Sequence, residues 1–217
     1  MNKKILILLT LTIVIVPAIF VNIASSQQTI EIDNFSLSRG WNLAYGLTDP
    51  SQIIGQGSNS NGVTDEEIRN AIEFIYVYAP VAKNYVLLYA KEGTKQTEEY
   101  KNFNPPEETP TSVTWVYSQK TYSIKYKSPE YPLLSNRDII KGWNFITISP
   151  EMENKSINDI KGNCTLESVY TYGEEDGVTQ WLNLQSVIDD KRMLGEGSAS
   201  GLQLVIKVGD DCRMGIQ

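Results

Sequence analysis

The longest apolar stretch of the chain, Ile5 to Val21, lies near the N-terminus and is interrupted only by two threonines and one proline. Two lysines precede it, and the small residues Ala24 to Ser26 follow it. This order is typical of a secretory signal peptide. Because about 17 apolar residues also approach the length that spans a bilayer, an uncleaved membrane anchor is the alternative. Either interpretation of residues 1–28 predicts an extracellular or cell-surface protein, either secreted or held by its N-terminal helix.

Beyond this segment, two short helices are predicted from their caps. Thr64 and Glu67 form a capping box, and apolar residues then follow at helical spacing. This pattern predicts a helix from Asp65 to about Glu73. A second helical turn is predicted over Ser156–Ile160, where a serine and an aspartate stand three positions apart.

Most of the remaining apolar residues fall in short β-branched and aromatic runs, which predict strands. Phe74–Tyr78 and Tyr85–Ala90 flank a break that contains a proline, and we expect them to pair as a hairpin. Further strands are predicted at Cys164–Tyr172, Val178–Leu184 and Leu202–Val208.

The alternation from Val113 to Tyr126 predicts another hairpin around a Gln-Lys turn. The expected register places Trp115 opposite Ile124 and Tyr117 opposite Tyr122, so that one face is wholly apolar. Gln-Lys is a poor sequence for a tight type I′ turn, which leaves this register open.

One pattern of elements occurs twice along the chain. RGWNLAYGL at 39–47 matches KGWNFITIS at 141–149. Each is followed by a loop, a helical turn and a strand of the form apolar-Tyr-x-Tyr, which is IYVY at 75–78 and VYTY at 169–172. Each unit then returns through another strand and closes with further strand. The order of these elements predicts an internal duplication.

The predicted fold is therefore mainly β. It has two tandem β-rich pseudo-repeats, built as sandwich- or barrel-like antiparallel sheets with one or two short helices, after an N-terminal apolar helix. The expected divisions are a signal peptide or anchor at 1–28, a first pseudo-repeat at 29–135, and a second at 136–217 that contains a disulfide.

The two cysteines, Cys164 and Cys212, both lie in the part of the chain predicted to be exported. An even number of cysteines in an exported chain predicts a disulfide. The alternative is a pair of free buried thiols. Their spacing excludes a CxxC-type metal or redox site.

The second half also carries a resemblance to a known group of proteins. GWN at 142–144, the Tyr-x-Tyr strand, the following Trp, a Gly-rich turn, LVIKV and the final Asp-Cys pair resemble the GWN-type repeats of exported archaeal and bacterial surface proteins. The resemblance covers Gly142 to Cys212, and WVY at Trp115 to Tyr117 is similar more loosely. It implies an exported, cysteine-bridged β domain and no particular reaction.

Charge and histidine content narrow the function. The chain has 19 Lys and Arg against 26 Asp and Glu, and removing residues 1–28 removes two lysines, which leaves 17 against 26 and a net charge of −9. This charge argues against nucleic acid and anionic membrane surfaces as partners, so we expect contact with a membrane only through the N-terminal segment. The chain contains no histidine. The Ser-His and Cys-His nucleophile pairs and the usual zinc sites are therefore excluded.

The aromatic residues offer a candidate binding platform. Trp41, Trp115, Tyr117, Tyr122 and Trp143 are the candidates, because exposed aromatic rings stack well on sugars. The competing interpretation is that Trp41 and Trp143 are buried anchors at strand starts. In that interpretation, Gly allows close backbone approach and Asn makes a turn hydrogen bond.

Acidic clusters and sequons give no stronger candidates. Glu174 to Asp176, Asp189-Asp190 and Asp210-Asp211 carry the oxygen ligands that calcium prefers, but they lack a known calcium-loop spacing, so solvated turns are expected. Nothing selects a carboxylate pair for glycoside hydrolysis. Three sequons are compatible with surface glycosylation, and burial beside Cys164 is expected to block the third of them; they begin at Asn34, Asn154 and Asn163.

We therefore predict a non-enzymatic exported or membrane-tethered surface protein with a structural or interaction role, and no catalytic residue, cofactor or metal. Other cell-surface proteins or glycans are the expected partners. The alternative is an extracellular glycan- or peptide-binding module that uses exposed Trp and Tyr. The third hypothesis is a histidine-free hydrolase.

Overall fold

The computed structural model describes six stretches of the chain, which are residues 29–56, 62–93, 113–129, 137–175, 178–194 and 203–215. The predicted signal peptide or anchor at 1–28 lies outside the described residues. Within these stretches, no helix has the length and apolar character needed to cross a membrane. The described part is mainly β, with four antiparallel sheets and two α-helices, as the sequence predicts.

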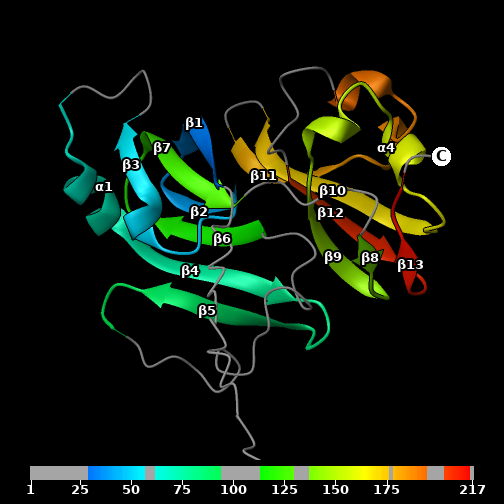
Figure 1. Ribbon diagram of the computed structural model, residues 1–217, viewed down its shortest axis with the longest axis horizontal. Helices are drawn as coiled ribbons and strands as arrows, with labels where there is room; N and C mark the ends of the chain where they lie inside the picture. The colour runs from blue at the N-terminus through cyan, green and yellow to red at the C-terminus, as the bar shows by residue number, and fades with distance from the viewer. Residues whose placement is uncertain are drawn as a thin grey trace, which may run out of the picture.

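The first half of the described chain, residues 29–129, contains two sheets. A three-stranded sheet has the order β1-β7-β3, and a four-stranded sheet has the order β2-β6-β4-β5. Helix α1 packs beside β3 and β4 (Figure 1). The elements are β1 (Thr29–Leu37), β2 (Gly40–Tyr45), β3 (Ile53–Gln56), α1 (Asp65–Ala71), β4 (Ile72–Ala79), β5 (Asn84–Ala90), β6 (Val113–Ser118) and β7 (Tyr122–Pro129).

The second half, residues 137–215, also has a four-stranded sheet, in the order β9-β12-β10-β11, and a two-stranded sheet of β8 and β13. Its elements are β8 (Asp138–Ile139), β9 (Gly142–Thr147), α4 (Ile157–Ile160), β10 (Leu166–Glu175), β11 (Val178–Asn183), β12 (Gln203–Val208) and β13 (Cys212–Arg213). Short 3-10 helices lie in both halves at Pro50–Gln52, Pro150–Met152, Gln185–Val187 and Lys191–Leu194.

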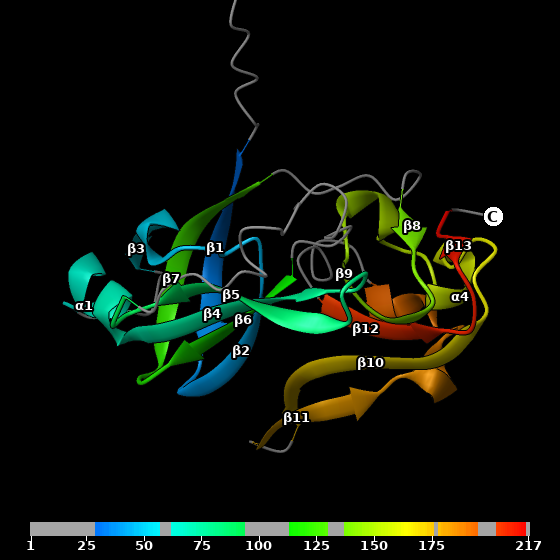
Figure 2. The same ribbon diagram turned by 90° about the horizontal axis from the view of Figure 1, so that it is seen from below.

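In the two four-stranded sheets, strands that correspond in sequence order occupy the same positions across the sheet. In each half, the GWN strand (β2 or β9) forms one edge of the sheet. It pairs with the strand that comes last in the sequence (β6 or β12), and a hairpin (β4–β5 or β10–β11) forms the other side of the sheet. The strand before each GWN (β1 or β8) pairs with the strand that follows β6 or β12 (β7 or β13), and the register is the same in both halves. Leu37 pairs with Tyr122, and Ile139, which stands at the same distance before its GWN, pairs with Cys212. Figures 1 and 2 show the halves side by side.

Local sequence signals account for the helices and one hairpin. Both predicted caps are present as capping boxes. The hydroxyls of Thr64 and Ser156 each accept from the backbone N–H three residues on, and their own backbone N–H groups donate to the carboxylate of that residue. The hairpin predicted from Phe74 to Ala90 is also confirmed as β4 paired with β5, with Tyr78 opposite Tyr85.

The hairpin predicted from Val113 to Tyr126 is wrong. β6 pairs with β2 and β4, whereas β7 pairs with β1 and β3, so the two strands belong to different sheets. The chain changes sheets after Ser118, which is the last residue of β6 to pair with β2 and β4 and whose hydroxyl donates to the Lys120 carbonyl. Beyond this point, Ile124 and Tyr126 are buried in the core between the two sheets.

Each half has its own apolar core, and a third cluster joins them. The first core lies between the two sheets of the first half and includes Leu37, Ile53, Ile68, Ile75, Val116 and Ile124. The second includes Ile146, Ile157, Ile160, Val169, Leu204 and Ile206. The joining cluster contains buried Leu43, Val113, Phe145 and Val205, with aromatic rings packed around it. At this cluster, the two four-stranded sheets contact each other through their outer faces, which are the faces turned away from the first and second cores.

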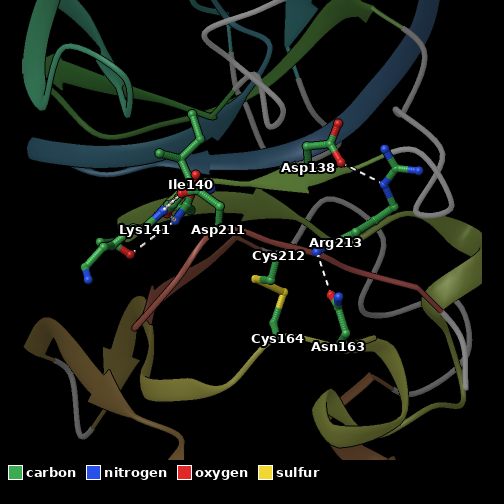
Figure 3. Close-up of a disulfide and its surroundings, with 10 residues drawn as sticks. Asp138, Ile140, Lys141, Asn163, Cys164, Asp211, Cys212 and Arg213 are labelled. Atoms are coloured by element: carbon green, nitrogen blue, oxygen red, sulfur yellow. Dashed lines mark hydrogen bonds and ion pairs between the residues drawn. A yellow bond between two sulfur atoms is a disulfide. The ribbon is translucent and has the colours of Figure 1, made fainter.

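The predicted disulfide is confirmed. Cys164 and Cys212 are bonded, with their Cα atoms 5.1 Å apart, inside the range that a disulfide requires. The bond ties β13 to the segment before β10 (Figure 3). Arg213 extends this tie, because its backbone N–H donates to the Asn163 side chain at 2.7 Å and its guanidinium pairs with Asp138 at 2.7 Å.

Candidate binding groove

The first GWN segment is shaped by its asparagine. Asn42 is buried, and its Oδ1 accepts a hydrogen bond from the Ser38 backbone N–H at 2.8 Å. Its Nδ2 donates to the carbonyls of Ser38 at 2.8 Å and Gly40 at 3.0 Å. The side chain therefore closes a tight turn, as predicted. Gly40 has a φ of +103°, which residues with a Cβ rarely adopt.

The second GWN segment repeats this arrangement. Asn144 is fully buried, accepts from the Ile140 backbone N–H at 3.2 Å, and donates to the carbonyls of Ile140 at 2.7 Å and Gly142 at 3.2 Å. Gly142 has a φ of +108°. No atom lies within 4 Å of a Cβ placed at Gly40 or Gly142, so the expectation that these glycines permit close backbone approach is wrong. Their positive φ is what requires glycine.

The expectation that Trp41 and Trp143 are buried anchors is also wrong. Trp41 is 41% exposed and Trp143 is 40% exposed. Successive side chains of a strand point to opposite faces. Because the following asparagine occupies the inward position in order to satisfy the turn, each tryptophan lies on the outer face of its sheet.

Aromatic residues cover the outer face of the first four-stranded sheet. The Trp41 ring lies 5.1 Å from that of Tyr117, 6.0 Å from Tyr76 and 6.2 Å from Trp115, measured between centroids. These residues come from three adjacent strands, with Trp41 opposite Tyr117 and Trp115 between Leu43 and Tyr76. The contacts are tilted or edge-to-face, which is the favoured geometry for aromatic pairs.

The hairpin of each half reaches the sheet of the other. From the second half, Tyr172 on β10 and Trp181 on β11 contact Trp115, with centroids 5.0 and 5.6 Å away. From the first half, Tyr78 on β4 and Tyr85 on β5 contact Phe145, at 5.3 and 6.4 Å. The two halves are therefore joined by reciprocal aromatic contacts around the apolar cluster.

Two adjoining pockets lie along this junction. The first has a volume of about 470 Å³ and is lined by Trp41, Tyr76, Tyr85, Trp115, Tyr172 and Trp181. The second has a volume of about 540 Å³ and is lined by Tyr78, Tyr85, Trp143, Phe145, Tyr170, Trp181 and Val205. Because they share Tyr85 and Trp181, we treat them as one aromatic groove. All four tryptophans of the chain line it.

The described lining of the aromatic groove carries no charged side chain. Its polar groups are indole N–H groups and tyrosine hydroxyls. Burial raises the pKa of Tyr78 and of Tyr85 above the ordinary tyrosine value, so these hydroxyls stay neutral near physiological pH. The described lining is thus suited to an uncharged ligand.

The other predicted platform residues divide between the groove and the core. Tyr117 contacts Trp41 at the rim of the aromatic groove. Tyr122 does not join it, because its ring packs against the first core. Eight lining residues were missed as candidates: Tyr76, Tyr78, Tyr85, Phe145, Tyr170, Tyr172, Trp181 and Val205. The signal for six of them was the pattern that occurs twice in the sequence, because its Tyr-x-Tyr strands supply four tyrosines and the apolar runs after them begin with Tyr85 and Trp181.

Two of the three acidic clusters contact neighbouring basic residues, and the third, Glu174 to Asp176, has side chains that lie outside the described residues. Asp190 pairs with Arg192 at 2.6 Å, and Asp211 accepts the Lys141 backbone N–H at 2.7 Å. Among the described residues, no group of three or more possible metal ligands is assembled. The sequon asparagines are all exposed, so burial at the third is wrong; they are Asn34, Asn154 and Asn163.

A buried arginine lies away from the groove. Arg137 is 2% exposed and donates to the Thr147 carbonyl at 2.7 Å. Desolvation lowers its pKa to about 10, so the guanidinium remains charged at neutral pH. It holds the start of β8 against the end of β9, a structural role.

Comparison of the chain with protein-family models, with curated proteins and with solved structures found no match.

Proposed function

We propose that this protein is an exported, non-enzymatic binding module whose aromatic groove binds a proline-rich peptide segment in the polyproline II conformation. The observation that carries the proposal is the gathering of all four tryptophans in one uncharged, partly exposed groove. The exposed fractions of Trp41, Trp143 and Trp181 are 41%, 40% and 45%. Such a patch supports a binding role over the purely structural role that the sequence favoured.

Exposing these rings has a cost that a ligand would recover. Burying apolar surface stabilises a folded protein or a complex by about 25 cal/mol per Å². The exposed part of these rings does not contribute this free energy to folding, and a ligand that covers it would. Contiguous exposed apolar patches on soluble proteins commonly mark interaction sites. The groove also lies at the junction of two units, a frequent position for ligand sites.

Hydrogen-bonding capacity selects a peptide over a glycan. An indole N–H can only donate, and tyrosine hydroxyls are the only side-chain acceptors of the described lining, which has no carboxylate or amide. A sugar brings several hydroxyl donors that each need an acceptor. A proline-rich segment brings carbonyl acceptors and, at each proline, no N–H donor. Its pyrrolidine rings are apolar, and aromatic-lined grooves are a recurring site for polyproline II ligands.

The export and the duplicated architecture are parts of the same proposal. The N-terminal basic and apolar segment supports export. The shared strand order of the two four-stranded sheets and the matched bonds of Asn42 and Asn144 support the internal duplication into pseudo-repeats at 29–135 and 136–217. The exposed sequon asparagines are consistent with a surface location.

Titration of tryptophan fluorescence tests the proposed ligand, since every tryptophan lies in the groove. We expect dodecaproline to cause a saturable change in the exported protein, and a Gly-Ser peptide of equal length to cause none. Trp41→Ala should weaken this binding while the variant still unfolds in a single cooperative thermal transition. Tyr122→Leu, which alters an aromatic residue outside the groove, is the matched control and should bind normally.

Cellohexaose and maltohexaose, two neutral oligosaccharides, separate the alternatives in the same assay. Saturable binding of either sugar with no response to dodecaproline would assign the groove to glycans. No response to any of the three ligands would remove the binding proposal.

A further inference from the structure

We infer that the aromatic groove consists of two corresponding but unequal half-sites, related by an internal pseudo-two-fold, so that short proline-rich ligands bind twice and one long ligand spans both. The inference rests on the proposed function and adds the number, arrangement and relative strength of the sites.

The strand registers establish which residues correspond. Trp41 and Trp143 hold the same position in the two GWN strands, and Tyr76 and Tyr170 hold the same position in the two Tyr-x-Tyr strands. In the two hairpins, Tyr78 pairs with Tyr85 as Tyr172 pairs with Trp181. The first pocket uses Trp41, Tyr76, Tyr172 and Trp181; the second uses their counterparts Trp143, Tyr170, Tyr78 and Tyr85.

Each half-site is completed by the other half of the chain. The first pocket takes Trp41, Tyr76 and Trp115 from the first half, and Tyr172 and Trp181 from the second. The second pocket reverses these contributions. This reciprocity is what a two-fold relation requires. It also explains why both pockets contain Tyr85 and Trp181, which lie where the half-sites meet.

The half-sites differ at four corresponding positions. Trp181 of one hairpin corresponds to Tyr85 of the other, and Leu43 of the first GWN strand corresponds to Phe145 of the second. Trp115, between Leu43 and Tyr76, is replaced in the second half by Val205, between Phe145 and Tyr170.

At the rim, Tyr117 faces Trp41, whereas Lys207 faces Trp143 and is paired with Glu167 at 2.8 Å. The first half-site therefore gains the rings of Trp115 and Tyr117, whereas the second gains that of Phe145. Because the first half-site offers the larger aromatic surface to a ligand, we expect about tenfold tighter binding there.

A row of rings connects the half-sites. Successive centroids from Trp41 through Trp115, Trp181 and Tyr170 to Trp143 are 6.2, 5.6, 6.5 and 6.1 Å apart. A polyproline II segment advances about 3.1 Å per residue, so roughly eight residues follow this row from end to end. Hexaproline is too short to occupy both ends, so two copies fit when each extends past one end of the row, whereas dodecaproline is long enough to span it.

Calorimetric titration with these two peptides tests the arrangement on the exported protein. Hexaproline should bind at two per chain, with dissociation constants about tenfold apart, and dodecaproline at one per chain with at least tenfold higher affinity than hexaproline. Trp143→Ala should leave one tight hexaproline site, and Trp41→Ala one weak site. Either substitution should abolish the gain from length.

A gain-of-function variant provides an independent readout. Lys207→Tyr gives the second half-site the ring that Tyr117 supplies in the first, and should bring the two hexaproline constants closer together. Hexaproline bound at one per chain in the unmodified protein would overturn the two-site arrangement, as would unchanged stoichiometry in both tryptophan variants. Failure of both peptides to bind would instead remove the proposed function itself.

Discussion

Replacing Asn144 with alanine should destabilise the protein strongly, although the change removes only a small polar side chain. The Asn144 side chain is fully buried and makes three hydrogen bonds to the backbone of the turn before β9. Alanine leaves the Ile140 N–H and the carbonyls of Ile140 and Gly142 without these partners. The turn that aims Trp143 outward would also lose its closure.

The expected loss follows from these bonds. Each net hydrogen bond contributes about 1 kcal/mol, and a buried group left unsatisfied costs about 1–3 kcal/mol. Because parts of this turn are reached by water, the lower values apply, and we expect a loss of about 3 kcal/mol for Asn144→Ala. Asn42→Ala should lose a similar amount, since Asn42 makes the same bonds in the first half.

Urea unfolding followed by circular dichroism measures this loss. Asn163→Ala is the matched control, because Asn163 is exposed and accepts one backbone hydrogen bond, and it should cost less than about 1 kcal/mol. Asn144→Asp keeps the acceptor but sets a carboxylate oxygen against two carbonyls, so it should be at least as destabilising as alanine. A loss below about 1 kcal/mol for both Asn144→Ala and Asn42→Ala would refute the view that these side chains fix the two turns.

Three further outcomes are expected. Reducing the disulfide, which closes a 48-residue separation, should lower the free energy of unfolding by about 4 kcal/mol on the loop-entropy model; identical urea midpoints with and without reductant would contradict this. Dodecaproline affinity should be constant from about pH 5 to pH 9, because the described lining has no carboxylate, amine or imidazole and burial raises the pKa values of Tyr78 and Tyr85; a bell-shaped profile would contradict it. Hydrogen bonds from Arg192 lower the pKa of Asp190 to about 2, so this exposed pair favours the folded state above pH 3.8 and loses its effect as the pH falls toward 2. An NMR titration of the Asp190 carboxyl should show its midpoint return toward 3.8 in Arg192→Ala.

Local features of this fold were predictable because local chemistry decides them. The capping boxes at Thr64 and Ser156 need only a hydroxyl and a carboxylate three residues apart. The β4–β5 hairpin joins neighbouring apolar runs across a short break. The disulfide followed from having only Cys164 and Cys212 to pair.

The faces of the GWN strands were not predictable in the same way. A period of two places Trp41 and Asn42 on opposite faces but does not say which face is inside. Apolarity favours burying the tryptophan. The structure buries the asparagine because its side chain satisfies three backbone groups of the turn.

The aromatic groove required long-range information. It exists because the β10–β11 hairpin lies against β6 and the β4–β5 hairpin lies against β9, contacts between residues far apart in the chain. The hairpin predicted around Gln119-Lys120 failed for the same reason. β6 and β7 each pair with strands that lie much earlier in the sequence, and their being neighbours in the sequence did not indicate this pairing.

The ring row has an optical consequence. Trp41 and Trp115 cross at 88° and Trp115 and Trp181 at 76°, at centroid distances of 6.2 and 5.6 Å. Indoles this close couple their electronic transitions, so light absorbed by one ring is delocalised over its neighbours as an exciton. The far-ultraviolet dichroism of the protein should therefore contain a tryptophan couplet superimposed on its strand signal. Because Trp181 comes from the opposite half of the chain, part of that couplet depends on how the two halves pack against each other. A strand content fitted to the spectrum without the couplet would be in error.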